Sequence, residues 1–150
     1  MREVLTKSMA RNIFYGGSLF FILIFIGLSV HSHWYIVNVS TAEAPLTASV
    51  VGGKHVWEKH ACVNCHSILG EGAYFAPELG NVMTRWGVDQ DPEGAYEILD
   101  AWIKAQPSGT EGRRQMPFFD LTEEETRGLA EFLRWADHTD LQGWPPNDAG

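Results

Sequence analysis

The sequence predicts a mainly α-helical protein, in which one N-terminal membrane-spanning helix precedes a small helical domain. Three observations predict this fold. No charged residue lies between Arg11 and Glu43, and this stretch is strongly apolar at its centre. Later segments carry small and apolar residues at helical spacing, and the last of them begins with a helix-capping pattern. Strands are not indicated.

The apolar run at residues 13–30 has about the length of helix that crosses a bilayer. Trp34 and Tyr35 follow it, and such aromatic residues are typical of membrane interfaces. Two alternatives are a cleaved signal peptide and a buried core helix. The Ala-Glu-Ala sequence at 42–44 resembles a cleavage site but lies well beyond the apolar run, and the uniform apolarity argues against a core helix.

The flanking charges predict the orientation of this anchor. Its basic residues, Arg2, Lys7 and Arg11, all precede the apolar run, so the positive-inside rule places the N-terminus in the cytoplasm. We therefore expect residues 1–40 to form the transmembrane anchor with a cytoplasmic N-terminus, and residues 41–150 to form a periplasmic domain at a bacterial inner membrane.

The domain is acidic. From residue 43 onward, 18 acidic residues stand against 8 basic ones, a net charge of −10, whereas the chain before residue 42 has a net charge of +2. Such a domain repels nucleic acid and favours a cationic protein partner, mainly through the association rate. Simple solubility explains the same charge equally well.

The two cysteines of the chain lie in the sequence Cys62-Val-Asn-Cys65-His66. A Cys-x-x-Cys-His run indicates covalent attachment of one c-type haem: the thiols add to the vinyl groups, and the histidine is held beneath the iron. A thioredoxin-like dithiol would need a βαβ surround, which is not indicated. A zinc site would need further ligands, and His55 and His60 precede the motif in an expected helix.

Met116 is the expected second axial ligand, because a low-spin electron carrier needs one and methionine raises the potential. Met83 is the other methionine in the domain, and we expect it in the core or on the surface. Met116 precedes a helix that begins at Thr122, where Thr122 and Glu125 form a capping box. A methionine loop followed by a C-terminal helix resembles the small class I cytochromes c.

Two further helices are expected, at about 51–60 and 92–105. On the first, Gly53 would allow the C-terminal helix to cross closely, near Phe132 and Trp135. The class I resemblance also implies that Pro77 offers its carbonyl to Nδ1 of His66, which would fix the ring and raise its basicity.

The segment 62–82, above all Gly-Glu-Gly-Ala-Tyr-Phe-Ala-Pro-Glu-Leu at 70–79, resembles the small cytochrome c subunit of bacterial cytochrome-c-dependent nitric oxide reductase. The resemblance covers nearly the whole chain. It implies that the subunit takes electrons from a soluble periplasmic cytochrome c or cupredoxin and passes them to haem b of a large multi-helix subunit. That subunit reduces two NO to N2O at haem b3 and a non-haem iron, so this chain itself would carry electrons without being catalytic.

The same resemblance implies a calcium ion at the subunit interface, with the carbonyl of Gly72 and Tyr74 as ligands on this chain. From the residues alone, the glycines make a turn and Tyr74 packs on haem or protein. Two other functions remain: the cytochrome subunit of a terminal oxygen reductase or a free membrane-tethered carrier, and a haem-based gas sensor, which would need an open sixth site.

Overall fold

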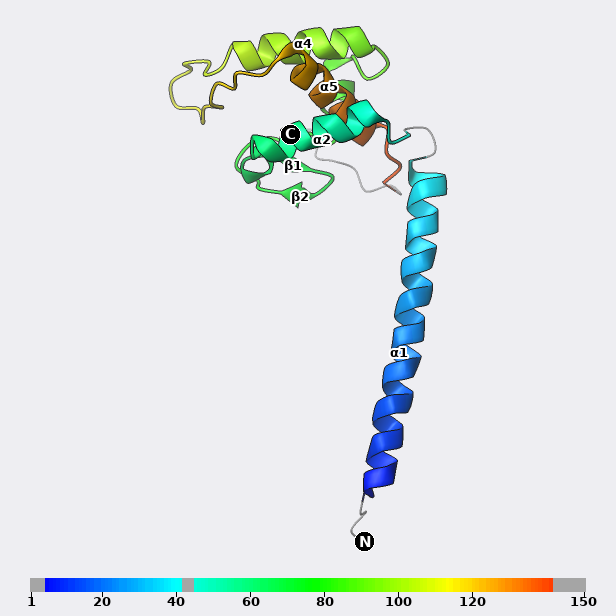
Figure 1. Ribbon diagram of the computed structural model, residues 1–150. Helices are drawn as coiled ribbons and strands as arrows, with labels where there is room; N and C mark the ends of the chain where they lie inside the picture. Colours follow the sequence, from blue (N-terminus) through cyan, green and yellow to red (C-terminus); the bar gives the residue numbers. More distant parts are fainter. Residues whose placement is uncertain (1–4, 42–44, 142–150) are drawn as a thin grey trace. The chain divides into compact units, whose positions relative to one another are not determined.

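The computed structural model describes residues 5–41 and 45–141, and the chain divides into two compact units, Met1–Val39 and Ser40–Gly150 (Figure 1). The mainly helical fold with one long N-terminal apolar helix is confirmed. Arg2 and the Ala-Glu-Ala sequence at 42–44 lie outside the described residues.

The first unit is built on α1, Lys7–Tyr35, which continues as a π-helical turn, Ile36–Ser40. The side chain of Thr6 caps its N-terminus by accepting from the amide of Met9. The helix contains the expected apolar run and extends beyond it in both directions. Among the described residues it is the one helix long and apolar enough to cross a membrane, and none of its residues is buried.

Three helices form the core of the second unit: α2 (Ala48–Lys59), α4 (Pro92–Lys104) and α5 (Glu123–Asp137). The expected helices are present, but α2 begins three residues before the expected position because Thr47 caps it, its side chain accepting from the amide of Val50. The expected capping box at the start of α5 is present in full.

The α2 and α5 helices cross where two glycines face each other. A Cβ atom on Gly53 would overlap the carbonyl oxygen of Gly128 and lie 2.8 Å from Cβ of Phe132. The ring of Trp57, one turn along α2, lies 6.1 Å from the ring of Phe132. The backbones therefore approach more closely than any side chain at position 53 permits.

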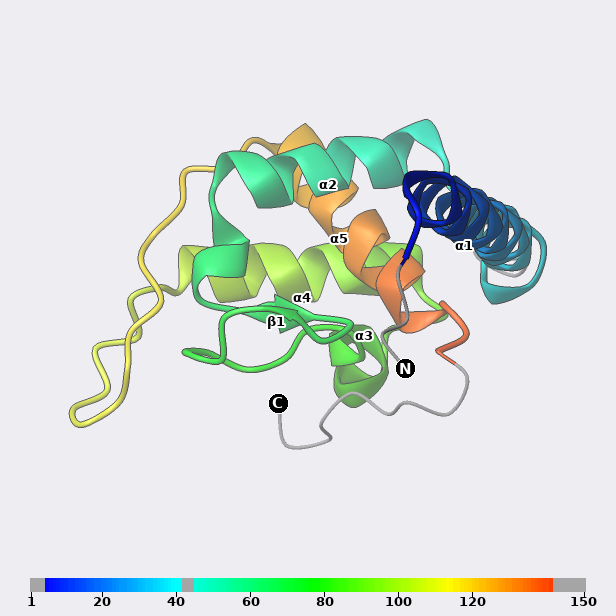
Figure 2. The same ribbon diagram turned by 90° about the horizontal axis from the view of Figure 1, so that it is seen from below.

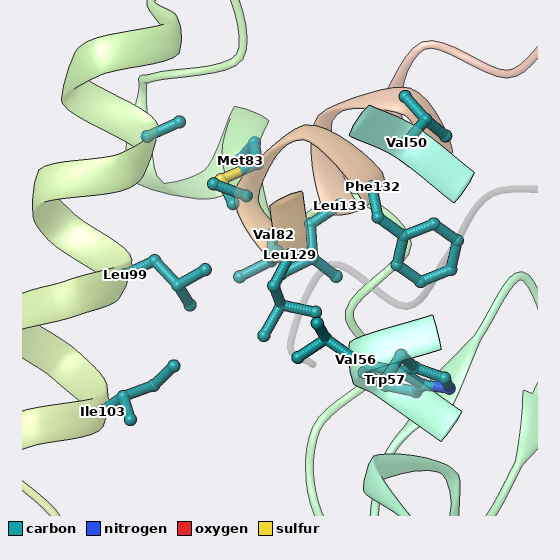
Figure 3. Packing of buried hydrophobic residues seen from close by; sticks show 12 residues of the cluster. Val50, Val56, Trp57, Val82, Met83, Leu99, Ile103, Leu129, Phe132 and Leu133 are labelled. Carbon is teal, nitrogen blue, oxygen red and sulfur yellow. The ribbon is translucent and has the colours of Figure 1, made fainter. Parts of the chain in front are cut away.

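The hydrophobic core lies between these helices. Figure 3 shows Leu99 and Ile103 of α4 facing the apolar side of α5, with Val56 and Trp57 of α2 contributing from their own helix. Twelve buried residues make up this cluster: Val50, Val56, Trp57, Val82, Met83, Ala95, Leu99, Ile103, Leu129, Ala130, Phe132 and Leu133.

Short elements connect α2 to α4: a 3-10 turn (Cys62–Asn64), β1 (Ser67–Ile68), β2 (Glu71–Gly72) and α3 (Val82–Trp86). The expectation of no strands was therefore wrong. The strands β1 and β2 form an antiparallel hairpin around Leu69 and Gly70, which both have positive φ, as the two central residues of a type I′ turn do. Strands of two residues are too short to show alternation.

Candidate haem site

The Cys-x-x-Cys-His motif forms one tight turn directly after α2. Ala61 adopts a left-handed conformation with φ of 53° and turns the chain away from the helix. The amides of Cys65 and His66 then both donate to the carbonyl oxygen of Cys62, at 3.1 and 2.9 Å. Both cysteines are half-buried free thiols. The turn thus presents two thiols and one imidazole from five consecutive residues.

Burial sets the chemistry of these groups. It raises the pKa of the Cys62 thiol to about 11, whereas redox-active dithiols have lowered values. Burial also lowers the pKa of His66, although the Pro77 carbonyl and the Glu78 charge act in the opposite direction. Neutral imidazole is the form that ligates a metal. Within residues 5–41 and 45–141, no three His, Cys, Asp or Glu side chains form a group able to hold a metal ion. These properties fit haem attachment better than a dithiol or a zinc site.

The ring of His66 is oriented by a backbone carbonyl. Its Nδ1 lies 2.8 Å from the carbonyl oxygen of Pro77. With the proton on Nδ1, the lone pair of Nε2 is available for iron. The segment that carries Pro77 is tied back to the motif, because Ala73 donates to the carbonyl of Val63 at 3.0 Å and Ala76 donates to that of Cys65 at 2.8 Å.

The loop that carries Met116 connects α4 to α5 and is drawn in yellow in Figure 2. Two contacts flank this half-buried methionine. Before it, Arg114 donates to the carbonyl oxygen of Phe75 at 2.6 Å and lies over the Phe75 ring. After it, the ring of Phe119 meets the ring of His60 edge to face, with centroids 5.6 Å apart. Met116 is therefore held between two contacts with the segments on either side of the motif.

Met83 lies elsewhere. It is fully buried in α3, and Figure 3 shows it among aliphatic side chains of the core, between α4 and α5. Its side chain has no exposed surface and is part of the packing of three helices. The structure thus separates the two methionines by environment: one in the core and one in the loop beside the motif.

Gly72, the last residue of β2, and Tyr74, two residues after it, are both exposed. Gly72 has φ of 122°, and a Cβ atom there would overlap the carbonyl oxygen of His66. Position 72 therefore requires glycine because its backbone lies close to that of His66. This requirement holds whether or not the Gly72 carbonyl binds calcium. The side chain of Tyr74 is 76% exposed. Its hydroxyl group lies 3.5 Å from the carbonyl oxygen of Gly70 and donates to it.

Sequence reasoning missed three residues that shape this region: Arg114 as a link to Phe75, Gly128 as the partner of Gly53, and Glu78. Glu78, which directly follows Pro77, is buried. The sequence offered one signal for Glu78: this acidic residue directly follows Pro77, the expected partner of His66.

Comparison with known proteins places this geometry in a family. The model of the family described as cytochrome c matches residues 50–137, so the expected cytochrome c domain is confirmed. Three relatives, each named as the C subunit of nitric oxide reductase, align over 150 residues and cover the whole of both chains. They come from Cereibacter sphaeroides (66% identical), Paracoccus denitrificans (62%) and Halomonas halodenitrificans (63%). This chain belongs to the family of nitric oxide reductase C subunits.

Membership of this family of nitric oxide reductase C subunits accounts for both units of the chain, since the alignments include the apolar helix as well as the domain. A cytochrome c domain carries covalently bound haem c. The residues described above fit that group: two neighbouring thiols, an imidazole with Nδ1 engaged, and a half-buried methionine in the loop between α4 and α5.

Proposed function

We propose that this chain is the electron-transfer subunit of a membrane nitric oxide reductase. It accepts electrons from a soluble periplasmic donor at a covalently bound haem c and passes them to haem b of the catalytic subunit, which reduces two NO to N2O. The observation that carries the proposal is the turn from Cys62 to His66 with the Pro77 carbonyl on Nδ1, in a chain that is similar to nitric oxide reductase C subunits throughout its length.

Each site residue has a role in this proposal. Cys62 and Cys65 would hold the haem through thioether bonds, and His66 would ligate its iron. Met116 would supply the second iron ligand, which favours a higher potential than a second histidine would. The haem held by these residues would supply one-electron redox chemistry. The contacts of Arg114 with Phe75 and of Phe119 with His60 hold the methionine loop against the segments after and before the motif.

The membrane arrangement follows from charge. Lys7 and Arg11 lie in the first turns of α1, so the N-terminus is cytoplasmic and the domain from about residue 41 is periplasmic, at the inner membrane. The net charge of −10 in the domain suits a donor with a cationic docking face, such as a small cytochrome c or a cupredoxin, because opposite charges speed encounter.

A calcium ion at the interface with the catalytic subunit is the finer part of the proposal. The carbonyl of Gly72, at the end of β2, and the side chain of Tyr74 offer oxygen atoms from two exposed residues. Within the described residues no three His, Cys, Asp or Glu side chains form a metal-binding group, and we propose that the partner subunit supplies the remaining ligands.

Purification from gently solubilised membranes tests the proposed function. We expect the chain to co-purify with a large haem b subunit as one unit that consumes NO and contains one c-type haem. The variant with both Cys62→Ser and Cys65→Ser should lose the c-type haem and donor-driven NO consumption. Recovery of the chain alone, or oxygen uptake without NO turnover by the complex, would favour a tethered carrier or an oxygen reductase subunit.

A further inference from the structure

Glu78 is a buried carboxylate at the centre of the segment that follows the haem motif. It is 5% exposed. Its Oε1 accepts hydrogen bonds from two backbone amides, those of Leu69 at 2.8 Å and Gly80 at 3.0 Å. Burying a carboxylate is costly unless its oxygens are hydrogen-bonded, so this arrangement compensates for the lost hydration.

The surroundings are shaped to hold this carboxylate. Leu69 has a positive φ of 50°, which is unfavourable for a side chain of its size, and the bond from its amide to Glu78 supports that conformation. Gly80 leaves the space that the carboxylate occupies, since a Cβ atom there would lie 2.8 Å from Oε1. The hairpin turn and the chain after Pro77 are thus both fastened to one oxygen atom.

Glu78 also follows directly after the residue that orients the histidine. The backbone around Pro77 is held on both sides, because Ala76 donates to the carbonyl of Cys65 at 2.8 Å and Leu79 donates to that of Ser67 at 2.9 Å. The carbonyl of Glu78 itself accepts from the Arg85 guanidinium at 2.7 Å. These three hydrogen bonds involve backbone carbonyls, whereas the Glu78 carboxylate acts through its side chain. Its negative charge also acts on the ring of His66.

We propose that Glu78 is a positioning residue that holds the Pro77 carbonyl on Nδ1 of His66 and, with its buried charge, lowers the reduction potential of the haem. This inference rests on the proposed ligation by His66. Two effects act in the same direction. A negative charge near the iron favours the ferric state, and a firm bond from Nδ1 to a carbonyl makes the imidazole a stronger donor, which also favours ferric iron.

Redox titration of the c-type haem in the purified complex tests the inference. Glu78→Gln keeps the size of the side chain and an oxygen that can accept both hydrogen bonds, but removes the charge. We expect its midpoint potential to lie above that of the wild type. Glu78→Leu also removes the acceptor, so we expect a still higher potential, together with faster exchange of the Leu69 and Gly80 amides in hydrogen–deuterium exchange.

Two matched controls separate this role from general effects. Glu97→Gln removes an exposed acid on α4. Thr126→Val removes the hydrogen bond that buried Thr126 donates to the carbonyl of Thr122, the residue that caps α5. Both should keep the wild-type potential, although Thr126→Val should lower thermal stability. If Glu78→Leu yields no haem-bearing protein, the potential of Glu78→Gln is the deciding measurement, because this variant keeps the hydrogen-bond acceptor and removes only the charge.

Two results are distinguishable. A wild-type potential in Glu78→Gln, with the c-type haem intact, would overturn this inference and leave the proposed function standing. A wild-type complex without a c-type spectrum in alkaline pyridine would overturn the proposed function, and this inference with it.

Discussion

Different forces hold the crossing of α2 and α5 and the segment 62–80, which follows α2 in the chain. At the crossing, two glycines bring the helix backbones together, and the apolar sides of both helices are buried around them. Segment 62–80 has little regular structure and few buried apolar residues. Single hydrogen bonds hold it instead, from Ala73, Ala76 and Leu79 to backbone carbonyls and from Leu69 and Gly80 to one carboxylate.

The difference indicates that stability and the orientation of the haem-binding groups depend on separate parts of the domain. Helix packing gives most of the stability, because it removes a large apolar area from water. The hydrogen-bonded segment sets the direction of one imidazole ring and of the two thiols. We therefore expect substitutions at the crossing to lower the stability of the whole domain, and substitutions in the segment to change mainly the haem environment.

Gly53→Ala should have the largest effect. The added methyl group would overlap the Gly128 carbonyl, which belongs to the backbone of a packed helix and cannot move aside. We expect a loss of about 3 kcal/mol or more in the free energy of unfolding, with little haem-bearing chain recovered from membranes. The neighbouring Gly52 is the matched control, since nothing lies within 4 Å of its Cβ position. Gly52→Ala should raise stability by about 0.5–1 kcal/mol, and equal losses in both variants would contradict the close crossing.

Gly72→Ala should act on the haem environment as well as on stability. Its methyl group would overlap the carbonyl oxygen of His66, and the φ of 122° is unfavourable for alanine. We expect a loss of roughly 2 kcal/mol and a changed low-spin spectrum of the ferric haem. Gly109→Ala provides the comparison, because φ is 70° there and nothing lies near the Cβ position. It should cost about 1 kcal/mol and leave the spectrum unchanged. A normal spectrum in Gly72→Ala would argue against this contact.

Met116→Leu should change ligation more than stability. With the thioether removed, the sixth position is open, and we expect the reduced c-type haem to bind carbon monoxide rapidly. Met83→Leu is the matched core substitution: it should cost less than about 1.5 kcal/mol and keep a six-coordinate haem that resists carbon monoxide. Rapid binding in the wild type would overturn the Met116 assignment and favour a gas sensor.

The smallest effect is expected at the ion pair that links the two crossing helices at the surface. Lys59 lies 2.6 Å from Glu125, and this bond, with that from the Thr122 amide, lowers the pKa of Glu125 from 4.5 to about 2. The stabilisation is therefore fully present above pH 4.5 and is lost as the pH falls from 4.5 towards 2. At pH 7, Glu125→Gln should have a lower free energy of unfolding than the wild type. This difference in stability should disappear as the pH falls from 4.5 towards 2. Glu124→Gln, its exposed neighbour, should follow the wild-type profile in acid unfolding.

The sequence was most informative where local rules decide the structure. The apolar run, the capping box at Thr122 and the periodicity of α4 each depend on nearby residues, and each predicted an element that is present. It was less informative where distant residues decide. The five-residue helix α3 and the hairpin at Leu69 are too short for periodicity, and leucine at positive φ runs against its own preference.

The site shows the same division. The thiols and the histidine were predicted from their spacing alone, because five consecutive residues carry the chemistry. The contact of Pro77 with His66 was expected from the family resemblance. Spacing alone could not predict it, because the two residues are eleven positions apart and no single regular element spans them. Gly128 and Glu78 were missed because their importance depends on what the folded chain brings to them: a glycine on another helix, and two amides with no partner in a helix or sheet.

Stopped-flow reduction of the intact complex tests the central claim most directly. A reduced soluble cytochrome c or cupredoxin is mixed with the oxidised complex in the absence of NO, and the c-type and b-type absorbance bands are followed separately. The c-type band should change first and the b-type bands should follow, and the reduced complex should consume NO when NO is then added. Reduction of the b-type haems while the c-type haem stays oxidised would contradict an electron-transfer role for this chain.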